Sequence, residues 1–127
     1  MGAPPLVMGD KITGTCVGHL AIGPLGVPVA APPLPFAASI ALGLSPNVNF
    51  GGKAAATAGA SGQNGQPHAG LHASDPCMLP TAQIGHVVSG SATVLINGKP
   101  AATQQSRCTC CVVPGNGVPS VMTVLIG

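Results

Sequence analysis

Short runs of apolar, β-forming residues recur along the chain, and each ends at a pair of small turn residues. In GSATVLINGKPAAT (90–103), the apolar run Val94–Ile96 precedes Asn97-Gly98, and small residues follow. Asn-Gly is the strongest signal for a two-residue hairpin turn, because both positions accept positive φ. No stretch of a dozen residues free of Gly and Pro has a 3.6-residue apolar period. The pattern therefore predicts short β-strands joined by tight turns.

This strand-turn cassette is repeated. The segment LSPNVNFGGKAAAT (44–57) matches half of its positions, including the Gly-Lys of the turn. TVLIG (123–127) repeats the first strand and stops where the turn would come, and GAPPLVMGD (2–10) resembles what should follow such a turn. We therefore predict three copies, one of them split between the two ends of the chain. Pairing of those ends would leave no free strand edge at the seam and would give a compact body with three similar faces.

The segments between the copies are rich in proline and glycine. Residues 25–44 are uncharged and long enough to suggest a membrane span, but their prolines argue against a helix. We expect an extended arm lying against a protein surface, with a membrane anchor as the alternative. Residues 59–80 are expected to form a polar loop.

Length and composition limit the class of protein. The chain has 127 residues and a mass of 12.2 kDa, which predicts a single domain, 1–127. Gly and Pro are abundant, but 46% of residues are hydrophobic and only 5% are charged, the opposite of a disordered chain. A net charge of +2 is too small for a nucleic-acid partner. The first residues lack the basic region and apolar run of a signal peptide, so we expect synthesis in the cytoplasm.

Soft metal ligands gather in three places outside the cassettes. These are Cys16 and His19; His68, His72 and Cys77; and Cys108, Cys110 and Cys111. Zinc accepts thiolate and imidazole ligands from separate loops, so closure of the three copies would allow a mixed His/Cys site. The alternative is that Cys16 and Cys77 are small buried apolar residues, which we prefer for each taken singly, and that two of the clustered thiols oxidise. His86 is expected to be an ordinary strand histidine.

Catalytic chemistry has little support. The only carboxylate side chains are Asp10 and Asp75, each in a turn, and Cys16 with His19 has no evident orienting carboxylate. We expect that the protein is not an enzyme.

The residues from 88 to 111, VSGSATVLINGKPAA followed by Cys110, resemble the strand, turn and terminal cysteine of the PAAR-repeat family. The similarity extends more weakly through PPLVMGD, NFGGKAAAT and VLIG. It implies an all-β, pseudo-threefold cone of short strands and hairpins with long Pro/Gly-rich loops. Such a cone caps the trimeric spike of a contractile injection system, of the type VI secretion or phage-tail-like kind, with one tip per trimer. The resemblance also implies release outside the cell or into a target cell, transient contact with the target membrane, and possible effector cargo.

The resemblance further implies an apical metal ion that sharpens the tip, with zinc expected and iron as the alternative. Carried onto this chain, its ligands would be His19, His68, His72 and Cys110. The family pattern has a histidine seven residues before the cassette glycine, where this chain has Gln83, so the ligand set must differ. Which other groups replace or join these ligands stays open among Cys16, Cys77, His86, Cys108 and Cys111. The competing interpretation is a free-standing, small metal-binding adaptor domain that carries cargo.

Overall fold

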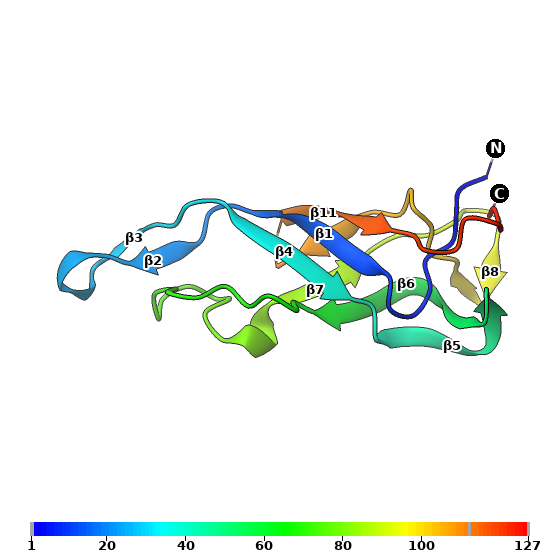
Figure 1. The fold of residues 1–127 in the computed structure, drawn as a ribbon, viewed down its shortest axis with the longest axis horizontal. Coiled ribbons are helices and arrows are strands. Elements are labelled where there is room, and N and C mark those ends of the chain that lie inside the picture. Colours follow the sequence, from blue (N-terminus) through cyan, green and yellow to red (C-terminus); the bar gives the residue numbers. More distant parts are fainter. Residues whose placement is uncertain (1, 112, 127) are drawn as a thin grey trace.

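The computed structural model describes residues 2–111 and 113–126, and its regular elements there are β-strands and two short 3-10 turns (Figure 1). The strands are β1 (Lys11–Cys16), β2 (Leu20–Ile22), β3 (Pro28–Ala30), β4 (Leu34–Ser39), β5 (Leu42–Phe50), β6 (Lys53–Gln63), β7 (Ile84–Val87), β8 (Leu95–Ile96), β9 (Lys99–Pro100), β10 (Cys108–Cys110) and β11 (Val113–Val118). The 3-10 turns are η1 (Pro24–Gly26) and η2 (Pro80–Ala82). Within the described residues no helix has the length and apolarity needed to cross a membrane. The all-β prediction is confirmed.

Seven strands form one antiparallel sheet in the order β4-β1-β11-β10-β7-β6-β5. The sheet curls until β4 meets the chain that leaves β6, where Ala38 bridges Asn64 and the Gly65 N–H donates to the Ala37 carbonyl at 2.8 Å. Its interior is filled by aliphatic, cysteine and phenylalanine side chains, among them Ile12, Cys16, Phe36, Ala38, Val87, Cys108 and Cys110. The result is a narrow barrel, which suits a chain with so few aromatic residues.

One end of the barrel is closed around an approximate three-fold axis. The Leu6 N–H donates to the Ala102 carbonyl at 3.0 Å, the Ala102 N–H to Ala56 at 3.0 Å, and the Ala56 N–H to Leu6 at 2.9 Å. All three residues are buried, and each belongs to a different copy of the cassette. The predicted repeat is therefore confirmed as a closed, three-membered ring of backbone hydrogen bonds.

The cassette turns have the predicted geometry. The Gly51–Gly52 turn has φ values of +58° and +79°, and the Asn97–Gly98 turn has +53° and +82°, both of the kind that matches strand twist in a two-residue hairpin. In the third copy Ala3 and Ile126 exchange hydrogen bonds of 3.0 and 2.8 Å at the equivalent place. The chain ends thus lie side by side, as predicted for a split copy (Figure 1).

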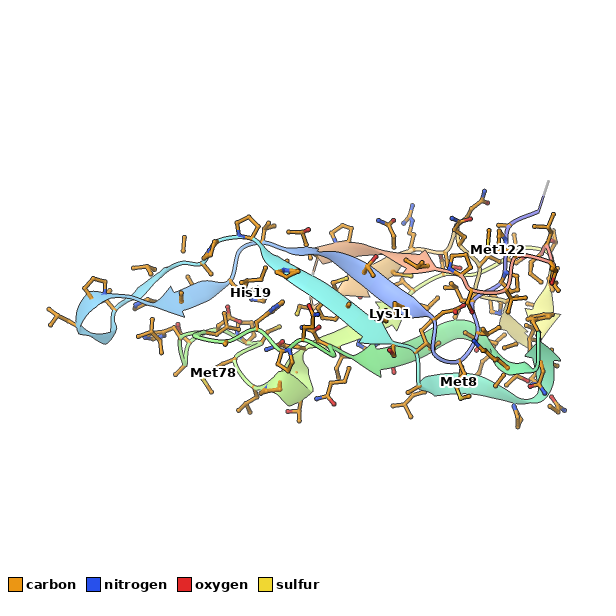
Figure 2. The ribbon with its side chains drawn as sticks, in the orientation of Figure 1. Met8, Lys11, His19, Met78 and Met122 are labelled. Atoms are coloured by element: carbon orange, nitrogen blue, oxygen red, sulfur yellow. The ribbon has the colours of Figure 1, made fainter. Side chains whose placement is uncertain are left out.

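The molecule is elongated, and its two ends differ (Figure 1). We call the end with the ring, the three cassettes and both chain termini the base. The opposite end, formed by the β2–β3 hairpin and η1, is called the apex. Met122 lies at the base, and His19 lies where the apical hairpin joins the barrel (Figure 2).

The proline-rich segment, residues 25–44, does not have the structure that we expected. It does not lie as an extended arm on a surface: it supplies the turn and second strand of the β2–β3 hairpin, and it forms β4 and the start of β5. Strands tolerate proline where no N–H is required, at edges and bulges. Pro46 illustrates this, because it lies in the edge strand β5 between Leu44 and Asn49, where the register with β6 shifts.

The polar segment 59–80 is also less loop-like than expected, because its first residues extend β6 to Gln63. A Cβ atom at Gly62 would collide with the backbone carbonyl of Ser39. This glycine therefore allows a close approach of two strands rather than a flexible loop.

Ala102→Leu is expected to destabilise the fold by about 1 to 3 kcal/mol, because the ring has no space for the added atoms. Ala102 is fully buried beside Leu6 and Ala56. The midpoint of denaturant unfolding measures the effect. The exposed Ala92 of the same cassette provides the control: Ala92→Leu should change stability by less than about 0.5 kcal/mol. Equal midpoints for the two variants would contradict tight packing at the axis.

Candidate metal centre

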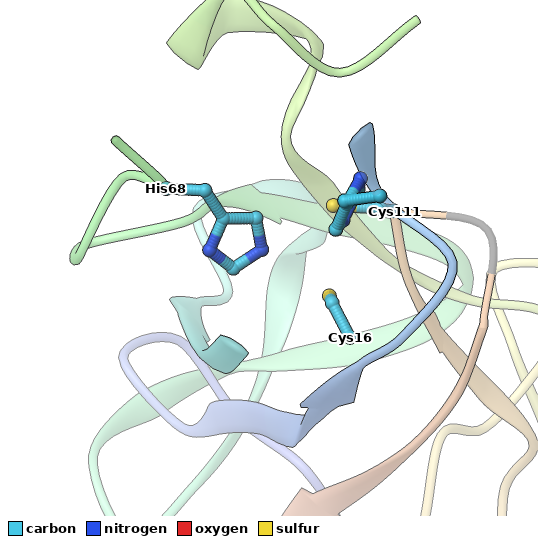
Figure 3. A group of neighbouring side chains, drawn as sticks. Cys16, His68 and Cys111 are labelled. Atoms are coloured by element: carbon cyan, nitrogen blue, oxygen red, sulfur yellow. The ribbon is translucent and has the colours of Figure 1, made fainter. Parts of the chain in front are cut away.

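Four side chains from separate segments converge where the barrel meets the apical hairpin. Cys16 ends β1, His19 follows it, His68 lies in the loop after β6, and Cys111 directly follows β10. Their ligand atoms all lie within 4.8 Å of one another. Figure 3 shows Cys16, His68 and Cys111 facing a common space. We call these four residues the apical cluster.

The chemistry of the apical cluster fits a metal ion. The Nε2 atoms of His19 and His68 are buried and have no hydrogen-bond partner among the described residues. This arrangement is costly for polar atoms unless a further ligand satisfies them. Two thiols and two imidazoles form the donor set of tetrahedral zinc sites. The four residues could therefore hold one metal ion.

Asp75 orients one of these histidines. Its carboxylate can only accept, so His19 Nδ1, at 3.0 Å, must carry the proton and donate. Burial raises the pKa of Asp75, but N–H donors from Leu20, Cys77 and His19 outweigh it, and the pKa is lower than usual. With Nδ1 held by Asp75, Nε2 is the atom of His19 that is left to bind a ligand in the cluster. A carboxylate behind a ligating histidine fixes its tautomer and raises its basicity.

Gln83 holds the loop of the other histidine. Its fully buried side-chain oxygen accepts from the His68 N–H at 2.7 Å and from Asn64 Nδ2 at 3.1 Å. Its Nε2 donates to the Cys77 carbonyl at 3.0 Å. Where the PAAR pattern has a histidine, this chain has an amide that positions a histidine from another loop.

Neighbouring cysteines have opposite roles because the backbone turns between them. Cys110 is fully buried in the barrel, where a Cβ atom at Gly14 or Gly115 would meet its sulfur. Cys111 has a φ of +53°, and its N–H donates to the Ile84 carbonyl at 3.2 Å. Positive φ is uncommon for a residue with a side chain, and such residues are concentrated at functional sites. Here it brings Cys111, and not Cys110, to the apical cluster.

His72 also lies outside the apical cluster. Its Nε2 donates to the Gly26 carbonyl at 2.9 Å, and its Nδ1 accepts from the Ser74 N–H at 3.0 Å. Both ring nitrogens are therefore engaged, Nε2 with the apical hairpin and Nδ1 with the loop between β6 and η2, which we call the supporting loop. Of the four ligands that the sequence suggested, His19 and His68 lie in the apical cluster with Cys16 and Cys111, whereas His72 and Cys110 lie outside it.

The remaining candidates occupy different surroundings. His86 lies in β7 and is exposed, as expected of a strand histidine. Cys108 is buried in the barrel, with its thiol 3.7 Å from the Ser106 carbonyl. Cys77 forms a second group with His19 and Asp75, also within 4.8 Å. All five cysteines are free thiols.

Burial controls the protonation of the thiols. It raises the pKa of Cys16, with a smaller contribution from Cys77, and it raises the pKa of Cys111, with a further contribution from Cys16. Burial also lowers the pKa of His68, and nearby His19 adds to this. Without a cation these three groups are therefore uncharged near pH 7, as two thiols and an unprotonated His68.

Asp75 was missed as a functional residue by the sequence reasoning, although a signal existed. The chain has only two acidic residues, and one of them lies between His72 and Cys77. An isolated carboxylate beside soft ligands is the group expected behind a ligating histidine. No comparable signal identifies Gln83, since its role depends on loops that meet only in the fold.

The comparison with known proteins agrees with the cassettes and the ring. A family model described as the PAAR motif matches residues 30–111 and 79–127. No curated protein and no solved structure matches the chain. Because the two matches together cover most of the sequence, the chain belongs to the PAAR-motif family.

Proposed function

We propose that this protein is the single-copy tip of a contractile injection system, of the type VI secretion or phage-tail-like kind, and that its base caps a trimeric spike. The three-fold ring of hydrogen bonds between Leu6, Ala56 and Ala102 carries the proposal. A monomer with three similar sides can satisfy all three subunits of a trimer at once, whereas an asymmetric cap would match only one. The role is structural and needs no catalytic residues.

The base has the apolar character of a docking surface. Equivalent segments of the three copies, 48–50, 94–96 and 124–126, contribute to one cluster with Ala55 and Ala101. Several members of the cluster are only half-buried, namely Val48, Phe50, Val94 and Val124. Leu95 and Leu125 are 62% and 63% exposed beside it. Covering these side chains with a spike would remove apolar area from water.

The apical cluster supplies the second part of the proposal. A zinc ion held by Cys16, His19, His68 and Cys111 would join β1, β10 and the loop after β6 at the point where the barrel narrows to the hairpin. Cross-linking separate segments stabilises a small domain with few other contacts. The metal would thus stiffen the end that leads when the particle is driven from the cell that made it into a target membrane.

Mixing the purified chain with a trimeric spike protein is expected to give a complex of one chain per trimer, measured by light scattering or native mass spectrometry. Three chains per trimer would contradict the pseudo-threefold cap. Metal binding with no spike binding would favour the alternative, a free-standing metal-binding adaptor that carries cargo.

Leu95→Asp is expected to weaken spike binding by more than about tenfold, because it places a charge in the covered apolar surface. Its stability should change little, since Leu95 is exposed in the free protein. Leu25→Asp at the fully exposed apex is the matched control, and it should bind the spike normally. Calorimetric titration of both variants measures the difference, and equal weakening would show that the base is not the docking end.

A further inference from the structure

We propose that the β2–β3 hairpin is a lipid-inserting finger, whose end enters the boundary between the headgroups and the hydrocarbon of a bilayer. The inference deepens the proposed function by naming the segment of the apex that would enter the target membrane and the depth that it would reach. It rests on the proposed function in one respect only, namely that the apex is the end of the particle that reaches the membrane first.

Aliphatic side chains dominate the surface of the hairpin and the residues that lead into it. Those with at least 40% of their surface exposed are Val17, Ile22, Leu25, Val27 and Val29. Leu25, in the turn, is fully exposed, and the hairpin is the part of the chain farthest from both termini (Figure 1). Single exposed aliphatic residues are ordinary, but several within one protruding segment form an apolar end that marks a binding surface.

The same end carries no exposed charge that would resist entry into lipid. No Asp, Glu, Lys or Arg lies between Lys11 and Lys53 in the sequence. The supporting loop contains one acidic residue, Asp75, which is buried and bonded to His19. Lys11 lies at the start of β1, away from the hairpin (Figure 2). Moving this end into an apolar medium therefore requires no exposed ion to lose its water.

The backbone of the hairpin is also prepared for a medium without water, in which unpaired N–H groups are costly. At the turn, the Gly23, Gly26 and Val27 N–H groups donate within the hairpin, to Val27, Gly23 and Pro24 at 2.8, 3.1 and 3.2 Å. On the outer edge of β2 the Ile22 N–H donates to Gly70 at 3.1 Å. Pro24, Pro28, Pro32 and Pro33 have no N–H to satisfy.

Contacts with the supporting loop fix the finger to the metal centre. The His72 N–H donates to the Leu20 carbonyl at 2.8 Å, and its ring donates to the Gly26 carbonyl at 2.9 Å. The Leu20 N–H donates to Asp75, which also holds His19. A force applied to the turn is therefore carried to the apical cluster rather than absorbed by a free loop.

The absence of Trp and Tyr from the chain allows a direct test. The zinc-loaded Leu25→Trp variant, mixed with phosphatidylcholine vesicles, should show a blue shift of its emission and quenching by a bromine-labelled lipid. Leu95→Trp, at an exposed position of the base, is the control and should show neither. Equal shifts in the two variants, or no shift in either, would overturn the proposal.

Vesicle flotation with the Asp variants separates this inference from the proposed function. Leu25→Asp should lower the vesicle-bound fraction about tenfold while keeping spike binding, and Leu95→Asp should do the reverse.

Added salt should not weaken vesicle binding, because the finger is uncharged. Binding that requires anionic phosphatidylglycerol vesicles would overturn insertion in favour of electrostatic adsorption. Vesicle insertion without spike binding by the unmodified chain would overturn the proposed function alone.

Discussion

Replacing Cys111 by alanine is expected to lower zinc affinity by more than about 100-fold, because it removes one of four ligands. The same change at the adjacent Cys110 should leave one zinc ion per chain. The positive φ of Cys111 directs its thiol to Cys16, His19 and His68, while the Cys110 thiol fills the barrel beside Gly14 and Gly115. Competition with a chelating dye measures the affinity, and elemental analysis measures the stoichiometry.

The free energy of unfolding, measured with zinc and with EDTA, should distinguish the same two variants in a second way. Cys110→Ala leaves a small cavity in the barrel, so the unfolding free energy should fall by about 1 kcal/mol with or without zinc. Cys111→Ala should instead abolish the difference between protein with zinc and protein with EDTA, because only ligand binding produces that difference. Loss of metal from Cys110→Ala with retention in Cys111→Ala would overturn the apical cluster.

The two histidines of the same loop form an independent pair for this test. His68→Ala removes an unpartnered buried Nε2 from the cluster, whereas His72→Ala removes ring contacts to Gly26 and Ser74. Zinc affinity should therefore fall in the first variant. It should stay within a factor of about two in the second, because the His72 ring contacts neither the cluster residues nor the groups that orient them. Equal losses would show that the supporting loop, and not His68 itself, determines binding.

The contrast between base and apex explains how far the sequence could be interpreted. The cassettes are encoded locally, since Asn97-Gly98 and Gly51-Gly52 select their turns and the flanking aliphatic residues select strands. Their three-fold closure followed from the repeat and from the way the first and last residues complete one copy. Residues far apart in sequence were thus placed correctly, because similar local units pack in similar ways.

The composition of the apical cluster could not be obtained in this way. Cys110 and Cys111 are adjacent and chemically identical, and the choice between them depends on one backbone angle set by the hydrogen bond to Ile84. His68 and His72 are separated by the path of a loop that Gln83 holds from within the core. The expectation of an extended arm was wrong for a related reason. Prolines are compatible with strands at the edges of a sheet, and which strands are edges is a property of the assembled sheet.

The apparent zinc affinity is expected to rise by up to about 100-fold for each pH unit between pH 7 and 8, because binding displaces one proton from each of two thiols. Burial raises the pKa of both Cys16 and Cys111, so both are protonated in this range before the metal binds. His68 releases no proton, because its pKa is lowered, and Asp75 remains a carboxylate for the same reason. Dye competition in several buffers gives the slope, and their different ionisation heats give the proton count by calorimetry.

Without metal the dependence of stability on pH should reverse in sign. A thiol with a raised pKa keeps its proton in the folded state at a pH where the unfolded chain has lost it. The contribution of these protonated thiols to the free energy of unfolding is therefore complete below about pH 8.5, the usual cysteine pKa. It is lost as the pH rises further. Cys110, whose pKa burial raises to about 12, adds to this loss but not to zinc binding. The melting temperature in EDTA should thus fall more steeply above about pH 8.5 than that of the zinc form, which keeps the Cys110 contribution but not those of Cys16 and Cys111. Parallel curves for the two forms would contradict thiolate ligation.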